Sequence, residues 1–121
     1  MVMSHTGVSS VLIAALVAFG QQSGGSQVRA WAECGGPVSA TAIMSCSLLI
    51  DSGTLTKAEQ TRAYTLRGTA KGRMRDFPGA IADYARAIEL APQSPDAYYL
   101  RGAVYLVTRE NDKAIADMTR T

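Results

Sequence analysis

Two stretches of the chain, YTLRGTA at residues 64–70 and YYLRGAV at residues 98–104, are nearly the same seven residues written 34 positions apart. A second pair of stretches continues the match at the same offset, AIADY at 80–84 and AIADM at 114–118. Together they give eight identities at one spacing. Self-similarity at a fixed period of this length is typical of stacked supersecondary units. We therefore expect two copies of one small structural unit.

The first copy has the pattern of a helix pair. Thr56 followed by Glu59 forms the capping-box pattern that begins a helix, which we expect to run to about Met74. Apolar residues spaced as on one face of a helix between positions 80 and 88 indicate a second helix, and Pro92 is expected to end it. Each copy is therefore predicted to be two antiparallel helices.

The second copy repeats this pattern. Ser94 is the expected N-cap of its first helix, which runs to about Val107, and Asn111 is the expected cap of its second helix. Ile115 and Met118 are expected to pack inward from that second helix. The sequence stops seven residues short of a full second copy. We expect the outer side of this incomplete pair to be either a frayed end or a surface that stacks on another copy of the chain or on another protein.

Arg67 and Arg101 recur in register with the packing positions, which favours a structural role over a binding role. The glycine that follows each arginine is expected to let the two helices of its unit approach closely. We expect each arginine to pack its stem across the helix pair and to reach an acid such as Asp83 or Asp117 with its head.

Residues 61–121 resemble tetratricopeptide repeats. The family pattern combines aromatic residues, a Gly, a small Ala and a closing Pro, and the first copy meets it at Tyr64, Gly68, Ala80, Tyr84 and Pro92. The second copy meets it at Tyr98, Gly102, Tyr105 and Ala114. The chain departs from the pattern at Arg67 and Arg101, which replace a Leu, and at Lys71 and Met118, which replace aromatic residues. The resemblance implies an all-α fold, a short α-solenoid of antiparallel helix pairs.

The N-terminal part has a different character. Residues 8–19 are apolar and uncharged but too short to span a bilayer comfortably, and small residues two positions apart follow them. We expect residues 1–32 to be a signal peptide and spacer, with cleavage after residue 20 as an alternative. The prediction is therefore a short exported protein of bacterial type, periplasmic or secreted. The alternative is a chain anchored in a membrane by an uncleaved N-terminal segment.

Residues 33–56 are expected to cap the first repeat unit at 57–94, which the incomplete unit at 95–121 follows. Cys34 and Cys46 favour a disulfide, because a metal site needs more ligands than this sequence holds. Two free thiols in a reducing compartment are the alternative. A helix over 37–52 is predicted to pack on the first repeat through Ala40, Ile43, Met44, Cys46 and Leu48.

Tetratricopeptide repeats usually bind peptides or partner proteins in a groove lined by the first helix of each unit. Carried over by position, the candidate partner-binding residues are Arg62, Thr65, Thr69, Arg73, Tyr99, Ala103 and Leu106. Some family members hold a terminal carboxylate with Lys and Asn at two of these places. Because this chain has Thr65 and Thr69 in the first unit, that clamp is not expected. Tyr99 is the anchor candidate, and packing within the repeat is its alternative. Arg62 and Arg73 are candidates to meet an acidic segment, and solvated helix faces are their alternative.

Composition narrows the function classes. Twelve Lys and Arg against ten Asp and Glu give no basic footprint for nucleic acid. The single histidine is His5, inside the predicted signal segment, so no general base or Cys–His pair is expected in the mature chain. We predict no enzyme activity and no cofactor. The predicted function is an adaptor that binds a protein or peptide partner, and the alternative is a structural unit that assembles with itself.

Overall fold

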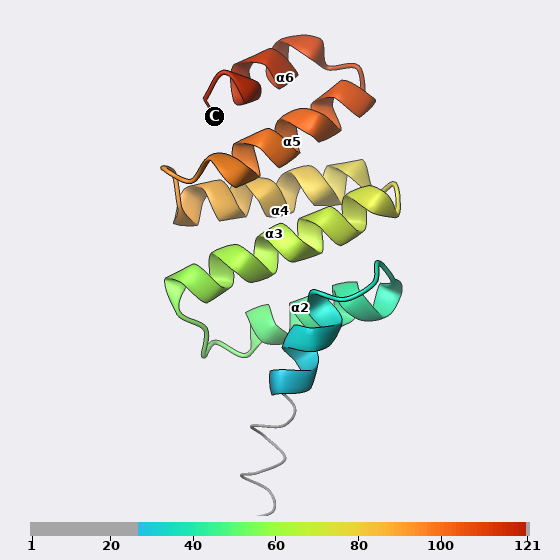
Figure 1. Cartoon of the computed structure of the whole chain (residues 1–121), viewed down its shortest axis with the longest axis vertical. Coiled ribbons are helices and arrows are strands. Elements are labelled where there is room, and N and C mark those ends of the chain that lie inside the picture. Colours follow the sequence, from blue (N-terminus) through green and yellow to red (C-terminus); the bar gives the residue numbers. More distant parts are fainter. Residues whose placement is uncertain (1–26, 121) are drawn as a thin grey trace, which may run out of the picture.

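The computed structural model describes residues 27–120, and every regular element in that range is a helix. Residues 27–34 are helical. They are followed by α2 (Ala40–Asp51), α3 (Lys57–Arg73), α4 (Phe77–Leu90), α5 (Pro95–Val107) and α6 (Asn111–Met118). Figure 1 shows these helices stacked in chain order along the long axis of the molecule. The predicted all-α fold is confirmed.

Helices that follow one another in the chain also lie side by side in space. α3 packs on α4 and α5 packs on α6, while α2 packs on α3 and α4 on α5. One further contact skips a helix, because α3 also touches α5. Contacts restricted to near neighbours define a solenoid, as the sequence predicted. The contact between α3 and α5 brings the first helices of the two units together on one face.

The helix starts follow the sequence only in part. At α3 the predicted capping box is present: Glu59 N donates to Thr56 Oγ1 at 3.2 Å, and Thr56 N donates to Glu59 Oε1 at 2.9 Å. The bond from the Thr56 backbone lowers the pKa of Glu59. Ser94 is the N-cap of α5 by position, but its side chain makes no capping hydrogen bond. The prediction for Asn111 is wrong, because Asn111 is the first helical residue of α6 and Glu110 is the N-cap.

The ends of α3 and α5 are built alike. Arg75 and Arg109, which are 34 positions apart, have left-handed backbones with φ of 68° and 63°. In both cases the next backbone N–H donates to the carbonyl five residues earlier, at 2.8 Å. This is the Schellman arrangement, which satisfies carbonyls at a helix end and usually takes Gly. The backbone therefore repeats at the same period as the sequence.

The glycines at the repeated triplets permit close helix contacts, as predicted. A Cβ on Gly68 would lie 2.9 Å from Tyr84 Cε1, and one on Gly102 would lie 3.0 Å from Met118 Cγ. These distances leave no room for a methyl group without a shift of the opposing helix or side chain. The two glycines therefore set the spacing of α3 on α4 and of α5 on α6.

The predicted pairing of the repeated arginines is confirmed in both units. Arg67 binds Asp83 through two hydrogen bonds of 2.8 and 2.7 Å, and Arg101 binds Asp117 through two of 2.8 Å. The hydrogen bonds to these acids raise the pKa of both arginines. The carboxylate side chains are only 5% and 7% exposed. Lys71 Nζ adds a second cation 3.1 Å from Asp83 Oδ2. In each unit, a nearly buried, bidentate ion pair therefore links the two helices.

The predicted disulfide between Cys34 and Cys46 is present. It forms a small core with Leu49, which holds the N-terminal segment against α2. The buried residues of α2 are Ala42, Ser45, Cys46 and Leu49. The packing face predicted for this helix is therefore largely wrong, since Met44 and Leu48 are each 63% exposed. The disulfide turns Cys46 inward, and the residues two positions before and after it consequently face solvent.

At the other end of the stack, Ile115 on α6 is 61% exposed, so the prediction that it packs inward is wrong. Ile81, its counterpart 34 positions earlier, packs between α4 and α5 in a cluster with Tyr84 and Val104. Within the described residues no helix follows α6 to cover Ile115 in the same way. Met118 does pack inward, against Gly102.

The predicted signal segment falls mostly on residues 1–26, which lie outside the described residues. The remainder of the predicted spacer is helical and makes contacts with the rest of the fold. Gln27 Nε2 donates to Thr54 Oγ1 at 3.0 Å, and Trp31 packs against the disulfide core. Ser45 donates to Glu33 Oε2 at 2.6 Å. In the range 27–120, no helix is both long and apolar enough to cross a membrane.

Candidate functional site

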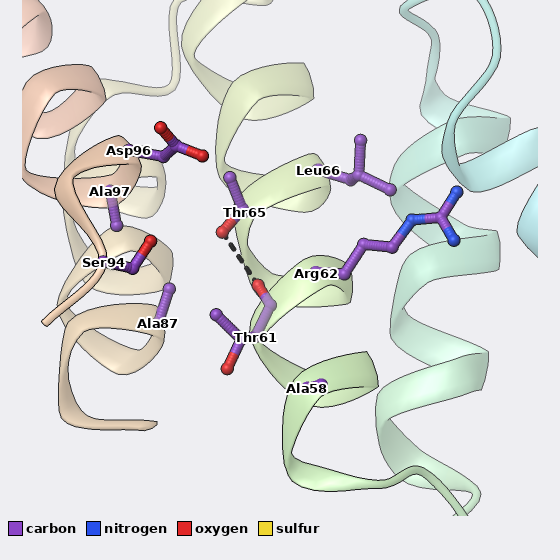
Figure 2. A pocket seen from close by; sticks show the side chains of 9 residues that line it. All are labelled: Ala58, Thr61, Arg62, Thr65, Leu66, Ala87, Ser94, Asp96 and Ala97. Carbon is purple, nitrogen blue, oxygen red and sulfur yellow. Dashed lines mark hydrogen bonds between the residues drawn. The ribbon is translucent and has the colours of Figure 1, made fainter. Parts of the chain in front are cut away.

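The face on which α3 lies beside α5 carries three openings that join end to end. The first lies near the start of both helices (Figure 2) and shares Thr65 and Asp96 with the second. The second shares Leu100 with the third, which extends toward the ends of α3 and α5. Their volumes are about 280, 400 and 230 Å³. We call these three adjoining openings together the α3–α5 groove.

The two walls of the groove come from the first helices of the two units. The α3 wall includes Thr61, Thr65, Thr69 and Arg73. The α5 wall includes Asp96, Tyr99, Leu100, Ala103 and Val107. Residues of α4, namely Ala87 and Tyr84, contribute at its two ends. Six of the seven residues predicted to bind a partner therefore border one groove, and Leu106 is the exception.

Arg62 borders the first opening, but its guanidinium is engaged elsewhere. The guanidinium carbon lies 4.8 Å from the centre of the Trp31 ring, a cation–π distance. Figure 2 shows the Arg62 side chain directed toward the neighbouring α2 side and away from α5. Arg62 therefore presents its stem to the groove and its charge to the N-terminal segment. No pattern in the sequence indicates this contact, because Trp31 belongs to the predicted spacer.

The repeat offset identifies which residues of α5 the sequence prediction missed. Leu106 is exposed and lines none of the three openings, whereas Val107 lines the third. Val107, not Leu106, is the counterpart of Arg73 at an offset of 34. Asp96 is likewise the counterpart of Arg62 and lines the first two openings. The 34-residue offset, applied to every α3 position, is the sequence signal that points to both residues.

Each threonine hydroxyl of the α3 wall donates its proton to a backbone carbonyl of the same helix. Thr61 Oγ1 donates to Lys57 O at 2.9 Å, and Thr65 Oγ1 donates to Thr61 O at 2.8 Å, as Figure 2 shows for the second bond. Thr69 Oγ1 continues the ladder by donating to Thr65 O at 2.9 Å. A hydroxyl has one proton and two lone pairs, so these groups keep only acceptor capacity for anything in the groove.

The far end of the groove has a fixed aromatic group and an exposed cation. Tyr84 OH lies 2.9 Å from Thr69 Oγ1, and since that hydroxyl already donates to the backbone, the tyrosine is the donor. Burial raises the pKa of Tyr84, so the phenol stays neutral. Arg73 borders the same opening with an exposed side chain. The groove therefore has a carboxylate near one end, Asp96, and a guanidinium near the other.

The middle of the groove is mainly apolar, although Asp96 also borders it. Tyr99 is 57% exposed on the α5 wall, beside Leu100 and opposite Thr65. Among residues 27–120, no group of three or more His, Cys, Asp or Glu side chains gathers in a way that would hold a metal ion. What the arrangement offers is a shallow trough with an apolar centre and charged ends, a form suited to an extended peptide segment.

Comparisons with known proteins agree with this architecture. The family profile described as "TPR repeat" matches residues 76–107, the span of α4 and α5. The crystal structure of MamA is similar with a TM-score of 0.59 and 32% sequence identity, over 66% of this chain and 44% of the MamA chain. The matched part is thus less than half of that protein. A comparison with curated proteins gives no match. Taken with the helix pairs and their 34-residue period, these matches show that residues 76–107 resemble a tetratricopeptide repeat and that the fold is similar to that of MamA.

Proposed function

We propose that this chain is an exported adaptor that holds an extended segment of a partner protein in the α3–α5 groove. Tetratricopeptide repeats are protein-interaction modules, which is the general role of this fold. The observation that carries the proposal is the run of three joined openings where α3 lies beside α5. Their apolar centre and oppositely charged ends match a peptide with an apolar residue between charged ones.

Tyr99 is the proposed anchor of the bound segment. Tyr99 is more than half exposed although it borders a groove, so partner contacts would bury apolar surface that the free protein leaves in water. Aromatic side chains dominate many binding hot spots for this reason. Arg73 is proposed to meet an acidic residue of the same segment at the far end of the groove.

Export is the second part of the proposal, and two features support it. The Cys34–Cys46 disulfide is compatible with an oxidising compartment such as a periplasm or the cell exterior. The apolar run at residues 8–19 has the pattern of a signal peptide. Cleavage after residue 32 would remove Trp31 from the disulfide core, so we take cleavage after residue 20 as the working form. The cleavage site is tested by measuring the mass of the N-terminal peptide of the protein isolated from its own cell. A chain that retains residue 1 would favour the membrane-anchored alternative.

The binding proposal is tested by crosslinking from inside the groove in the native host. A photoreactive amino acid is placed at Tyr99, and in a control protein at Arg86, an exposed position on α4 that lines none of the three openings. We expect one discrete foreign protein to be captured from position 99 and not from position 86. Purified partner should then bind the Tyr99→Ala and Arg73→Glu variants more weakly, while their helicity and melting stay near those of the wild type.

Equal capture from both positions would contradict the proposal, because the groove would have no special affinity. Loss of helicity in Tyr99→Ala would assign that ring to the fold instead of to binding. Capture of the protein's own chain alone would favour self-assembly, the second candidate function.

Self-assembly is supported by one specific observation, the exposure of Ile115. Its counterpart Ile81 packs against the next unit of the stack, so Ile115 presents the same kind of surface without a covering helix among the described residues. Stacking of a second copy there predicts melting that rises with protein concentration. Ile115→Asp should abolish that dependence without changing the melting of the dilute protein. Concentration-independent melting of the wild type would end this candidate.

A further inference from the structure

We propose that the first opening of the α3–α5 groove is a subsite for the ammonium group of a lysine on the bound segment. This inference rests on the proposed function, because it names the chemistry that the groove selects. The subsite is formed by Thr61 and Thr65 of α3 and by Ser94 and Asp96 at the start of α5. Figure 2 shows the Asp96 and Thr65 side chains directed into the gap between the two helices.

The hydrogen-bonding capacity of the side chains that line this opening is mostly that of an acceptor. Thr61 and Thr65 both donate their only hydroxyl proton to backbone carbonyls one turn earlier, at 2.9 and 2.8 Å. Their remaining lone pairs cannot serve an anion or a carbonyl group, but they can accept from a donor-rich cation. The Asp96 carboxylate is also acceptor-only when ionised. Only Ser94 keeps a hydroxyl that is not committed to a helix cap.

The charge of the opening also favours a cation. Asp96 lies in the first turn of α5, and no ion pair joins it to a cation among residues 27–120. The one basic residue that lines the opening, Arg62, holds its guanidinium over Trp31 and directs it away from α5. No lining group therefore neutralises the carboxylate from within the opening. An incoming cation would gain a charge-assisted hydrogen bond that the free protein does not make.

The shape of the opening favours lysine over arginine. Small side chains, Ala58, Ala87 and Ala97, complete the lining and leave a volume of about 280 Å³. Their methyl groups suit the four-carbon stem of a lysine, whose compact ammonium carries three donors that can point to separate acceptors. A guanidinium is planar and pairs best with a single carboxylate, through two parallel hydrogen bonds. Acceptors spread over two helices, Thr61 and Thr65 on one and Asp96 on the other, fit the ammonium better.

The test selects peptides with the full chain and then measures the lysine contribution. Random seven-residue segments are displayed between linkers, so that no free terminal amine is present, and are selected on the wild type, Asp96→Asn and Asp112→Asn. Asp112 is a matched control, because it also lies in the first turn of a helix, α6, but lines none of the three groove openings. The selected peptide is then made with Lys, Arg or Gln at its lysine position, and its Kd is measured by fluorescence anisotropy.

We expect lysine to be enriched at one position with the wild type and with Asp112→Asn, and not with Asp96→Asn. Changing that lysine to Gln should weaken binding to the wild type by about tenfold, and binding to Asp96→Asn by less than about twofold. Selected peptides without a lysine preference would overturn the subsite while leaving the groove function intact. An arginine peptide that binds as tightly as the lysine peptide would overturn the ammonium assignment. Failure to select any peptide would contradict the groove function itself.

Discussion

Replacing Gly68 by Ala tests the contact between α3 and α4, which positions the α3 wall of the groove. An added Cβ would lie 2.9 and 3.1 Å from two ring carbons of Tyr84 and 3.2 Å from Asp83 Cβ. Neither neighbour is free to move. The Tyr84 ring is 2% exposed and its hydroxyl is bonded to Thr69, while Asp83 is held by the two hydrogen bonds from Arg67. The methyl group must therefore push α3 and α4 apart.

Two opposing contributions set the size of the effect. Alanine is favoured over glycine in the interior of a helix by roughly 1 kcal/mol. Overpacking of a closely packed contact costs about 1–3 kcal/mol, and rigid neighbours place Gly68→Ala in the upper part of that range. We therefore expect the free energy of unfolding to fall by about 1–2 kcal/mol. For a domain of this size that corresponds to a melting temperature lower by roughly 4–15 °C.

Gly72 in the same helix supplies the control. A Cβ there would lie 3.6 Å from Ala80 Cβ and 3.9 Å from Val104 Cγ2, which are ordinary contact distances. Gly72→Ala should consequently keep the helix-propensity gain and stabilise the protein by about 0.5–1 kcal/mol. Urea unfolding followed by far-UV circular dichroism measures both variants against the wild type. If Gly68→Ala is as stable as the wild type, or Gly72→Ala loses as much as Gly68→Ala, the steric reasoning fails.

Three further perturbations test other parts of the fold. Arg101→Met should lower the free energy of unfolding by about 3 kcal/mol because it leaves a nearly buried carboxylate without its partner, whereas Arg67→Met should cost less because Lys71 remains beside the corresponding acid. Urea unfolding of the two variants gives the order, and equal losses would contradict the role of the lysine. Reducing the disulfide should cost about 3 kcal/mol and shift the fluorescence of the single tryptophan, Trp31, toward that of a solvated ring. An unchanged melting temperature in reducing buffer would show that the bridge adds little. The lowered pKa of Glu59 means that its contribution to stability is present above its unfolded-state pKa and is lost as the pH falls through the lower folded-state pKa. The gap in melting temperature between the wild type and Glu59→Ala should therefore close as the pH is lowered into the acid range, and a gap that persists would point to lost packing instead.

The repeated features of the fold were predictable from the sequence because each depends on a local or a periodic pattern. The capping box, the helix pairs and the arginine–acid bridges belong to this group. The buried face of α2 was not predictable in the same way. Its apolar residues point in several directions, and in the structure Leu49 packs in the core around the disulfide while Met44 and Leu48 face solvent. The contact of Arg62 with Trp31 was also beyond reach, because nothing local links a spacer residue to α3.

The chemistry of the groove follows from where the two repeat units differ. The residues that are identical at the 34-residue offset include those that pack, such as the arginine, the glycine and the acid that hold each helix pair together. The units differ along the groove, at Arg62 and Asp96, Thr65 and Tyr99, Thr69 and Ala103, and Arg73 and Val107. Two identical units would give both walls the same chemistry. Divergence instead sets a wall of hydroxyl acceptors, with a guanidinium at one end, against an apolar wall with a carboxylate at the other end. A peptide bound as we propose, between unlike walls and unlike ends, would have one favourable orientation, so a short pair of repeats would gain directional specificity without lengthening the array.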